Sequence, residues 1–324
     1  MSEDRLVETI TLSQARALVR TLAHRQSLLL LSPPGVGKSD TVAQAAAEAG
    51  LACRSLLGTQ IAPEDVSGIP RIVGERSVFC PPRVLLPEHP EPFCLFLDEL
   101  PACAPDVQKA FYSLLLERRL GEHRLPPGTW VVAAGNRLED RALVRSISSA
   151  LVNRVVVLQI RVDVDEWLAW AQANGVRDDI TAFIRSRPEA LLRPVPPNPV
   201  PFSTPRSWAA LSRAFDLAHA AGLLTKSVAR ALAHGRVSAE DADAFFLPPA
   251  PDLTATIRVG IRLRQNGVPM TGNNKIPAIK RLREMTHSGL KEAKDAVEAV
   301  TAMTDADVER WLHEHPEEAG PWQS

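Results

Sequence analysis

The feature that most constrains this chain is a short loop between an apolar run and a helix-forming stretch. The loop, residues 32–39, reads SPPGVGKS; four leucines precede it and an alanine-rich segment follows it as far as Gly50. Four consecutive apolar residues are typical of a strand buried on both faces of a parallel sheet. Glycines let the backbone approach a phosphate closely, and the N-terminus of a helix attracts an anion. The order of strand, loop and helix therefore predicts a phosphate-binding site.

Each residue type in the loop has an expected role. Lys38 is expected to reach the β- and γ-phosphates of a nucleotide, and Ser39 is expected to ligate Mg²⁺. Ser32 departs from the usual G-x-x-x-x-G-K-[ST] pattern, which has glycine there. The alternative is a Gly/Pro turn that precedes a helix by chance. The residues expected to contact ATP are Pro34, Gly35, Val36, Gly37, Lys38, Ser39 and Asp40.

A second apolar run ends in two acids. The segment CLFLDEL places Asp98 and Glu99 directly after a predicted strand, about 60 residues beyond the loop. In a parallel sheet this strand end lies beside Ser39, where Asp98 is expected to hold the Mg²⁺ shell. Glu99 is then expected to orient and deprotonate the attacking water. The alternative is a solvated pair of acids at a strand terminus.

The order of the motifs resembles that of the AAA+ ATPases, and within them the MoxR-like group. The resemblance covers about residues 13–245. One departure is DELPAC, since MoxR proteins usually carry Asn and Arg after the acidic pair. The matching segments are SPPGVGKS, APEDVSGIP, CLFLDEL, PDVQKAFYSLLLERRL, VVAAGN, ALVNRVV and FSTPRSW.

This resemblance implies three further site residues. Asn136 matches the first sensor, which contacts the γ-phosphate or the lytic water; the alternative is a turn-capping Asn. Arg154 matches the arginine that reaches into a neighbouring subunit's nucleotide site, although Arg137, Arg141 and Arg145 are rivals and a surface ion pair is the alternative. Arg206 matches the second sensor of the helical lid, with a solvated helix residue as the alternative.

The expected fold class is α/β. We expect an AAA+ parallel-sheet core, an αβα sandwich, in residues 1–162, and an all-α lid with a proline-rich connector (residues 194–201) in residues 163–249. A small C-terminal module, α/β or helical, is expected in residues 252–304, and a helical or disordered tail in residues 305–324. Core strands are expected at residues 28–31, 52–57, 93–97, 130–134 and 155–160, a hairpin around Gly74, and helices at residues 13–24, 106–119, 165–187 and 205–246.

Residues 275–298 resemble the C-terminal domain of the bacterial ribosomal stalk protein. The resemblance rests on KIPAIKRLR and GLKEAKDAVE, and the alternating residues 257–263 are expected to supply a preceding strand. Lys291 and Lys294 lie three apart on one exposed helix face. In the ribosomal family this face recruits translational GTPases, which implies a protein-docking module; the alternative is a generic helical pair. His287 and Ser288 depart from the family pattern.

Composition narrows the function classes. With 37 Lys and Arg against 38 Asp and Glu, the formal net charge is -1, which disfavours nucleic acid as a partner. The four cysteines form no CxxC pair and are expected to be reduced structural thiols. The N-terminus is polar, and no apolar run approaches the length of a membrane span, so we expect a cytoplasmic protein without membrane association.

Together these features predict an ATPase that uses ATP and Mg²⁺. The resemblance implies a ring, commonly a hexamer, that remodels a protein client, with a von Willebrand factor type A domain protein as a possible partner. Residues 58–84 are expected to face the ring centre, where Arg71, Arg76 and Phe79 would touch a client; a purely structural hairpin is the alternative. The alternatives for function are a DNA-directed AAA+ motor and a nucleotide-gated scaffold.

Overall fold

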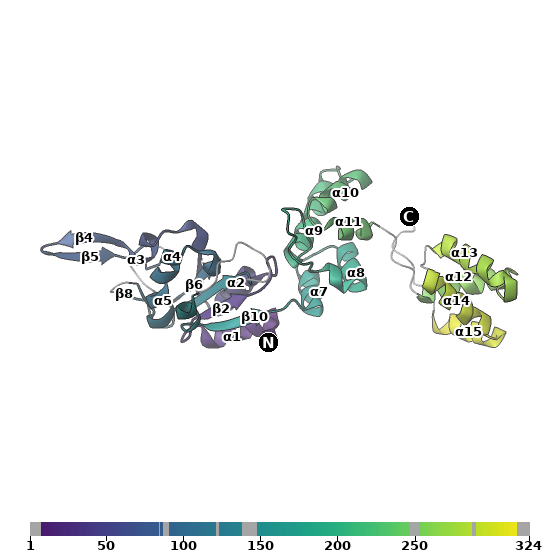
Figure 1. Ribbon diagram of the computed structural model, residues 1–324, viewed down its shortest axis with the longest axis horizontal. Coiled ribbons are helices and arrows are strands. Elements are labelled where there is room, and N and C mark those ends of the chain that lie inside the picture. Colours follow the sequence, from purple (N-terminus) through teal and green to yellow (C-terminus); the bar gives the residue numbers. More distant parts are fainter. Residues whose placement is uncertain are drawn as a thin grey trace, which may run out of the picture. The chain divides into compact units, whose positions relative to one another are not determined.

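Six parallel strands form the centre of the N-terminal part of the chain (Figure 1). The computed structural model describes residues 8–83, 85–86, 91–120, 123–137, 148–246, 253–286 and 290–315. It divides the chain into two compact units, residues 1–243 and 244–324. The sheet order is β1-β10-β2-β9-β6-β3. The strands are β1 (Thr9–Ile10), β2 (Leu28–Leu31), β3 (Ala52–Leu57), β6 (Phe93–Asp98), β9 (Trp130–Gly135) and β10 (Val156–Ile160).

The five predicted core strands are confirmed. The central strands of the sheet are buried on both faces. Alternate residues of a strand point to opposite faces. Leu28 and Leu30 of β2 accordingly pack in one core, and Leu29 and Leu31 pack in another. The first core includes α1 (Leu12–Leu22) and α2 (Lys38–Glu48), and the second includes α4 (Pro105–Ala110) and α5 (Tyr112–Glu117). The expected three-layer α/β core is therefore present.

The expectation of one continuous helix over residues 106–119 was wrong. The structure has α4 and α5 with a break at Phe111, whose amide donates to the carbonyls of both Val107 and Gln108. The Phe111 side chain is fully buried in the core. The hydrogen bond to Gln108 shows that the helical turn is tighter at Phe111 than in a regular α-helix. The break between α4 and α5 therefore lies at the residue whose ring packs in the core beside the sheet. After α5 the backbone leaves the helix at Arg118, which has a φ of 54°.

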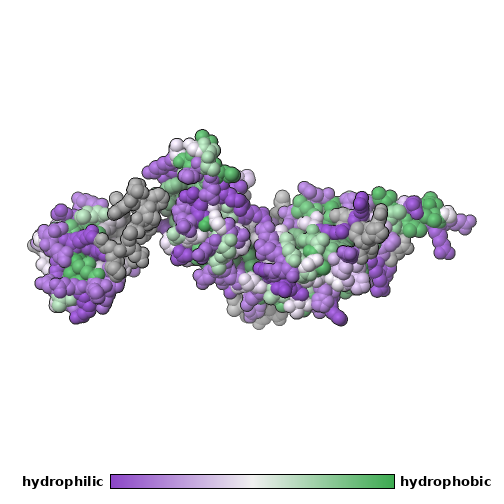
Figure 2. All heavy atoms as spheres, turned by 180° about the vertical axis from the view of Figure 1, so that it is seen from behind, coloured by the Kyte–Doolittle hydropathy of each residue, from purple (hydrophilic) through white to green (hydrophobic). Residues whose placement is uncertain are grey.

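A two-stranded hairpin projects from the sheet (Figure 1). It follows η1 (Gly58–Gln60) and α3 (Glu64–Ser67) and consists of β4 (Ile69–Val73) and β5 (Arg76–Cys80), as the sequence predicted around Gly74. Ile72 is 79% exposed, and Ile69, Val73 and Phe79 are exposed as well. Figure 2 shows apolar and polar residues side by side along this projection. Shorter elements of the same unit are η2 (Leu100–Ala102), β7 (Arg119–Leu120), β8 (His123–Arg124) and α6 (Ser149–Val152).

After the sheet, the first unit consists of helices and loops, with no strand among the residues that the structure describes there. The elements of this part are α7 (Val164–Ala173), α8 (Asp178–Ser186), η4 (Pro188–Ala190), α9 (Pro205–Ala220), α10 (Lys226–His234) and α11 (Ala239–Phe245). The proline-rich connector, residues 194–201, contains no helix, as expected. We call these helices and their connector the lid.

The second unit is helical in the ranges that the structure describes. Its elements are α12 (Leu253–Gln265), η5 (Gly272–Asn274), α13 (Lys275–Thr286), α14 (Leu290–Ala302) and α15 (Asp305–Glu314). The expected strand at residues 257–263 was wrong, because this stretch lies in α12. Its apolar residues alternate, but Ile257 and Ile261 are buried one helical turn apart and Gly260 packs against Val300 of α14. Helix packing therefore overrides a period-two pattern.

Several sequence predictions fall on residues outside the described ranges. These are Arg141, Arg145, His287, Ser288 and the expected end of the lid at residue 249. Across the described ranges, every helix is too short or too polar to cross a lipid bilayer.

Candidate functional site

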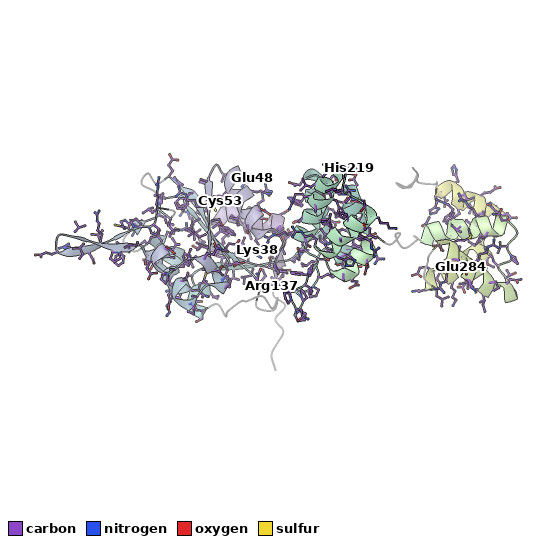
Figure 3. All side chains as sticks on the ribbon, turned by 90° about the horizontal axis from the view of Figure 1, so that it is seen from above. Lys38, Glu48, Cys53, Arg137, His219 and Glu284 are labelled. Atoms are coloured by element: carbon purple, nitrogen blue, oxygen red, sulfur yellow. The ribbon has the colours of Figure 1, made fainter. Side chains whose placement is uncertain are left out.

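The loop at residues 32–37 connects the central strand β2 to α2, with Lys38 at the first position of the helix (Figure 3). Gly35 and Gly37 have φ angles of 74° and 113°, a left-handed backbone that favours glycine. Ser32, which replaces the usual first glycine, is fully buried and is not among the left-handed residues. The loop therefore places glycine where the left-handed turns require it and tolerates serine at its start.

The Lys38 ammonium group lies inside the loop. Lys38 is 8% exposed, and its Nζ donates to Ser32 Oγ at 2.9 Å and to the Pro33 carbonyl at 3.3 Å. It also donates to Asn136 Oδ1 at 3.3 Å. Asn136 follows the last residue of β9, so the neighbouring strand brings its amide to the same edge of the sheet. Two residues predicted separately, Lys38 and Asn136, therefore meet at one point.

Ser39 and Asp98 are also brought together, as predicted. The Ser39 hydroxyl donates a 2.9 Å hydrogen bond to Asp98 Oδ2 at the end of β6. The other carboxylate oxygen, Oδ1, accepts the Glu99 amide at 3.0 Å. Mg²⁺ binds oxygen ligands and usually keeps several waters, with one or two carboxylates and substrate phosphates. A hydroxyl and a carboxylate beside the loop fit this ion.

Glu99 has a strained backbone. Its φ of 55° and ψ of 30° lie in the left-handed region, which is uncommon for a residue other than glycine. The hydroxyl of Thr59, in η1 after β3, donates to Glu99 Oε2 at 3.2 Å. The Cys103 thiol donates to the Glu99 carbonyl. Burial raises the pKa of this thiol to about 11, so it stays neutral beside Glu99. Thr59 was not predicted from the sequence, although its position just after a strand, at the edge where Asp98 and Asn136 lie, was an available signal.

The first turn of α9 contacts the phosphate loop directly. The Arg206 amide donates to the Gly35 carbonyl at 2.9 Å. A Cβ atom added to Gly35 would lie 2.6 Å from Thr204 Oγ1, so the loop and the lid are in close contact. Thr204 caps α9 by accepting from the Ser207 amide at 3.0 Å. Arg206 itself is exposed and lines the pocket described next.

A pocket of about 380 Å³ lies between the lid and the sheet domain, by which we mean the part of the first unit that precedes the lid. Gly35, Gly37 and Asp40 line it from the loop and α2, and Trp167 and Arg206 line it from the lid. The indole Nε1 of Trp167 is buried and has no hydrogen-bond partner among the described residues. Further lining residues are Leu12, Ser13, Arg16, Val36, Thr41, Gln44, Val162, Asp163, Glu166, Trp170, Pro205, Ala209 and Arg213.

A second contact joins the sheet domain to the lid at this pocket. Glu166 of α7 accepts the hydroxyl of Thr11 at 2.5 Å and the amide of Ser13 at 3.2 Å. Thr11 is the N-cap of α1, and the intervening Leu12 also lines the pocket. This contact was not predicted, since two residues 155 positions apart give no local signal.

Arg154 is not among the residues that line this pocket. Its guanidinium group is stacked over the Tyr112 ring, 4.8 Å from the centroid, and donates to the Ala150 carbonyl. Tyr112 in turn shares a 2.7 Å hydrogen bond with Ser148, the N-cap of α6. Arg154 is therefore held by its own chain in a defined orientation while remaining partly exposed.

The comparison with known families agrees with this geometry. The sequence of residues 27–155 matches the family model described as AAA domain (dynein-related subfamily). Residues 27–155 form an AAA domain. The AAA domain contains the phosphate loop, the acidic pair, Asn136 and Arg154, whereas Arg206 lies beyond the match. At the level of the family, an AAA domain implies a nucleotide-hydrolysing ATPase.

Further comparisons concern the C-terminal unit and the solved structures. Residues 268–313 match the ribosomal protein L7/L12 C-terminal domain. Among solved structures, the RuvB Holliday junction branch migration motor of Thermotoga maritima is 14% identical, with 94% of this chain and 95% of that chain covered and a TM-score of 0.42. NtrX of Brucella abortus is 14% identical, with 91% of this chain and 69% of that chain covered and a TM-score of 0.41. No curated protein sequence matches this chain.

Proposed function

We propose that this chain binds and hydrolyses ATP with Mg²⁺ at the loop between β2 and α2. The observation that carries the proposal is the 2.9 Å contact between Ser39 Oγ and Asp98 Oδ2. It joins the first turn of α2 to the end of β6, where a hydroxyl and a carboxylate are needed beside the β- and γ-phosphates. The phosphates would occupy the space in which Lys38 now contacts Ser32 and Asn136.

Each residue then has a defined task. Lys38 contacts the β- and γ-phosphates, and the amides of residues 34–40 surround the phosphate chain. Glu99 accepts a proton from the attacking water, and Asn136 hydrogen-bonds that water or the γ-phosphate. Bound Mg²⁺, held by Ser39 and Asp98, would neutralise charge on the phosphates. Arg206 reaches the phosphates from the lid, and the pocket of about 380 Å³ accommodates the nucleoside.

Two substitutions separate binding from hydrolysis. Glu99→Gln should keep the affinity for a fluorescent ATP analogue and lower the rate of phosphate release by about 100-fold or more, because general-base catalysis supplies a factor of that order. Lys38→Ala should lose binding itself. Asp106→Asn, at an exposed acid of α4, is the matched control and should leave both measurements unchanged. Wild-type turnover in the Glu99→Gln protein would remove Glu99 from its role.

We further propose a MoxR-like remodelling motor that forms a ring, commonly a hexamer in that group. Arg154 supports this reading, because it is partly exposed and held in one orientation by Tyr112. Arg154→Ala should bind ATP and lose turnover. Mixing it with Lys38→Ala subunits should restore some activity, since an intact arginine of one subunit then faces an intact loop of the next. Mixed assemblies without any recovery would count against a role in the neighbouring site.

The projecting hairpin is the proposed contact with a protein client. Its exposed Ile72 and Phe79 offer apolar surface, and Arg71 and Arg76 add positive charge. Glu99→Gln in the presence of ATP should retain a client in an affinity pull-down, and Ile72→Ser in the same background should release it. Recovery of nucleic acid instead of protein would favour a DNA-directed motor. A von Willebrand factor type A domain protein is the partner that the MoxR resemblance suggests.

The C-terminal unit is proposed to dock a protein. Ile276 and Leu290 are large apolar residues with most of their surface exposed, and Lys291 and Lys294 lie on the exposed side of α14. Leu290→Ser should release a partner that depends on this unit, whereas Ile72→Ser should not. The same pull-down therefore separates the two proposed surfaces.

A further inference from the structure

We propose that Asp241, a buried residue of the lid, is a positioning residue for the ATPase site. In this inference, which rests on the proposed function, Asp241 fixes the start of α9 and thereby holds Thr204 and Arg206 against the phosphate loop. Asp241 contacts neither the loop nor the pocket itself. Its effect would be transmitted through Ser203, which immediately precedes Thr204.

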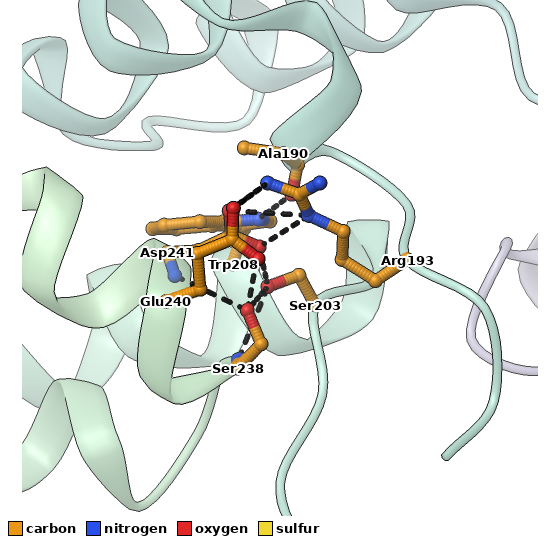
Figure 4. Close-up of polar contacts among 7 residues, drawn as sticks. All are labelled: Ala190, Arg193, Ser203, Trp208, Ser238, Glu240 and Asp241. Atoms are coloured by element: carbon orange, nitrogen blue, oxygen red, sulfur yellow. Dashed lines mark hydrogen bonds and ion pairs between the residues drawn. The ribbon is translucent and has the colours of Figure 1, made fainter.

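Three separate segments converge on the Asp241 carboxylate (Figure 4). The side chain is 1% exposed. Arg193, which immediately precedes the connector, donates through Nε at 3.0 Å to Oδ2, and its Nη2 donates to Oδ1. Ser203 donates to Oδ2, and Ser238, which immediately precedes α11, donates to the same oxygen at 2.7 Å. One carboxylate therefore ties both ends of the proline-rich connector to α11.

Ser203 occupies the centre of this cluster. Its side chain is fully buried, and its Oγ accepts the Ser238 amide at 3.1 Å while donating to Asp241. Its carbonyl accepts the Arg193 amide at 2.9 Å. Both the backbone and the side chain of the residue before the α9 cap are therefore fixed.

The next three residues connect this cluster to the phosphate loop. Thr204 packs so closely on Gly35 that a methyl group there would clash, and the Arg206 amide donates to the Gly35 carbonyl. A shift of Ser203 would therefore move the N-cap Thr204 together with the backbone amide and the Cα atom of Arg206. Misplacement by about 1 Å can cost roughly 100-fold in rate at a reacting centre.

The chemistry of the cluster suits alignment better than simple stabilisation. Replacing a buried ion pair with apolar residues of similar volume is often neutral or stabilising. Hydrogen bonds to a carboxylate, by contrast, fix directions, and here they come from three segments. Burial alone would raise the pKa of Asp241, but the bonds from Arg193, Ser203 and Ser238 outweigh it and lower that pKa, so the carboxylate stays charged.

A double-mutant cycle tests the inference. Arg206→Ala, Asp241→Asn and their combination are compared with the wild type for kcat and KM of ATP hydrolysis, at a temperature where all four are folded. Arg206→Ala should lower kcat at least tenfold, Asp241→Asn should lower kcat by a similar factor, and the combination should be no slower than Arg206→Ala alone. Losses that multiply in the combination would overturn the inference, because Asp241 would then act independently of Arg206.

A second variant and a second measurement keep the test valid if the Asp241→Asn protein is unstable. Arg193→Met/Asp241→Leu removes both charges and should melt near the wild-type temperature, yet keep the low kcat. Amide hydrogen exchange at Arg206 should be at least tenfold faster in this variant without nucleotide. Normal kcat and normal exchange in a stable Arg193→Met/Asp241→Leu protein would overturn the inference. Full activity of Arg206→Ala, or no turnover by the wild type, would instead overturn the proposed function.

Discussion

The hydroxyl of Thr59 donates a 3.2 Å hydrogen bond to Oε2 of Glu99, across the ends of the adjacent strands β3 and β6. Glu99 has a left-handed backbone, which sets the direction in which its side chain leaves the main chain. The carboxylate is hydrogen-bonded by a residue 40 positions away in the sequence. The orientation of the proposed base therefore depends on a residue outside the acidic pair.

Thr59→Val should lower kcat for ATP hydrolysis about tenfold and leave KM unchanged. The lost hydrogen bond to a charged group contributes roughly 1.5 kcal/mol, which corresponds to about that factor in rate. Steady-state phosphate release checks this expectation. Thr59→Ser keeps the hydroxyl and should retain wild-type kcat; equal rates for the Val and Ser variants would show that the contact does not orient Glu99.

Ser32→Ala should bind ATP more tightly than the wild type, by about threefold or more. The Ser32 hydroxyl accepts from Lys38 at 2.9 Å, and this contact would compete with the phosphates for the ammonium group. A ligand gains apparent affinity when the competing state loses stability. Titration with a fluorescent ATP analogue measures the change.

Ser27→Ala is the matched control for Ser32→Ala. Ser27 is also a buried serine, but its hydroxyl donates to the Leu115 carbonyl and does not contact Lys38. This variant should lower the melting temperature without tightening ATP binding. If both alanine variants change affinity equally, competition for Lys38 is not the cause.

Glu166→Ala should weaken ATP binding about tenfold. Glu166 joins α7 to the N-cap of α1 through Thr11 and Ser13, and both sides of this contact line the pocket. Hydrogen bonds to a charged group contribute about 1.5–3 kcal/mol, so their loss should loosen the pocket wall. Asp165→Ala, at the exposed neighbouring acid of the same helix, is the control for calorimetric titration. Comparable affinities for the two variants would contradict the role of the contact.

The stability of the first unit should depend on the charge of Asp241 in acid. Its folded pKa is lowered, so its contribution is fully present above the unfolded pKa of about 3.9 and is lost as the pH falls through the folded value. Asp241→Asn should lower the free energy of unfolding by about 1.5–3 kcal/mol at neutral pH, because Arg193, Ser203 and Ser238 lose hydrogen bonds to a charged acceptor. The difference from the wild type should shrink below about pH 4.

Urea unfolding at a series of pH values, followed by tryptophan fluorescence, measures this dependence. Trp208 is a fully buried probe in α9 that contacts Phe183 at a ring distance of 5.3 Å. A constant difference between the two proteins from pH 7 to pH 3 would show that the carboxylate charge contributes nothing to stability.

The sequence was sufficient to predict those elements that are marked by a continuous run of residues. The loop before Lys38 and the apolar runs of β2, β6 and β9 are continuous segments, and the carboxyl ends of parallel strands bring their final residues together. Ser39, Asp98 and Asn136 could therefore be placed near Lys38 without coordinates. In contrast, Thr59, Glu166 and Asp241 act through partners 35 or more positions away, so no spacing rule identifies them.

The incorrect predictions also have physical causes. Residues 257–263 alternate between apolar and polar or small residues, but the neighbouring helices α13 and α14 supply a core that only a helical face can fill. Phe111 belongs to a regular amphipathic pattern, yet the bulk of its buried ring is accommodated by a break between α4 and α5. In both cases packing partners distant in sequence decided the backbone conformation.

The close packing of Thr204 on Gly35 has a consequence for sequence variation in this protein. Position 35 is constrained from two directions, because its left-handed backbone disfavours side chains and the lid leaves no volume for one. Selection for folding alone should therefore eliminate substitutions at position 35, even in cells where ATP turnover by this protein is dispensable. Gly50, which is also left-handed but has open space around it, should accept asparagine under the same selection.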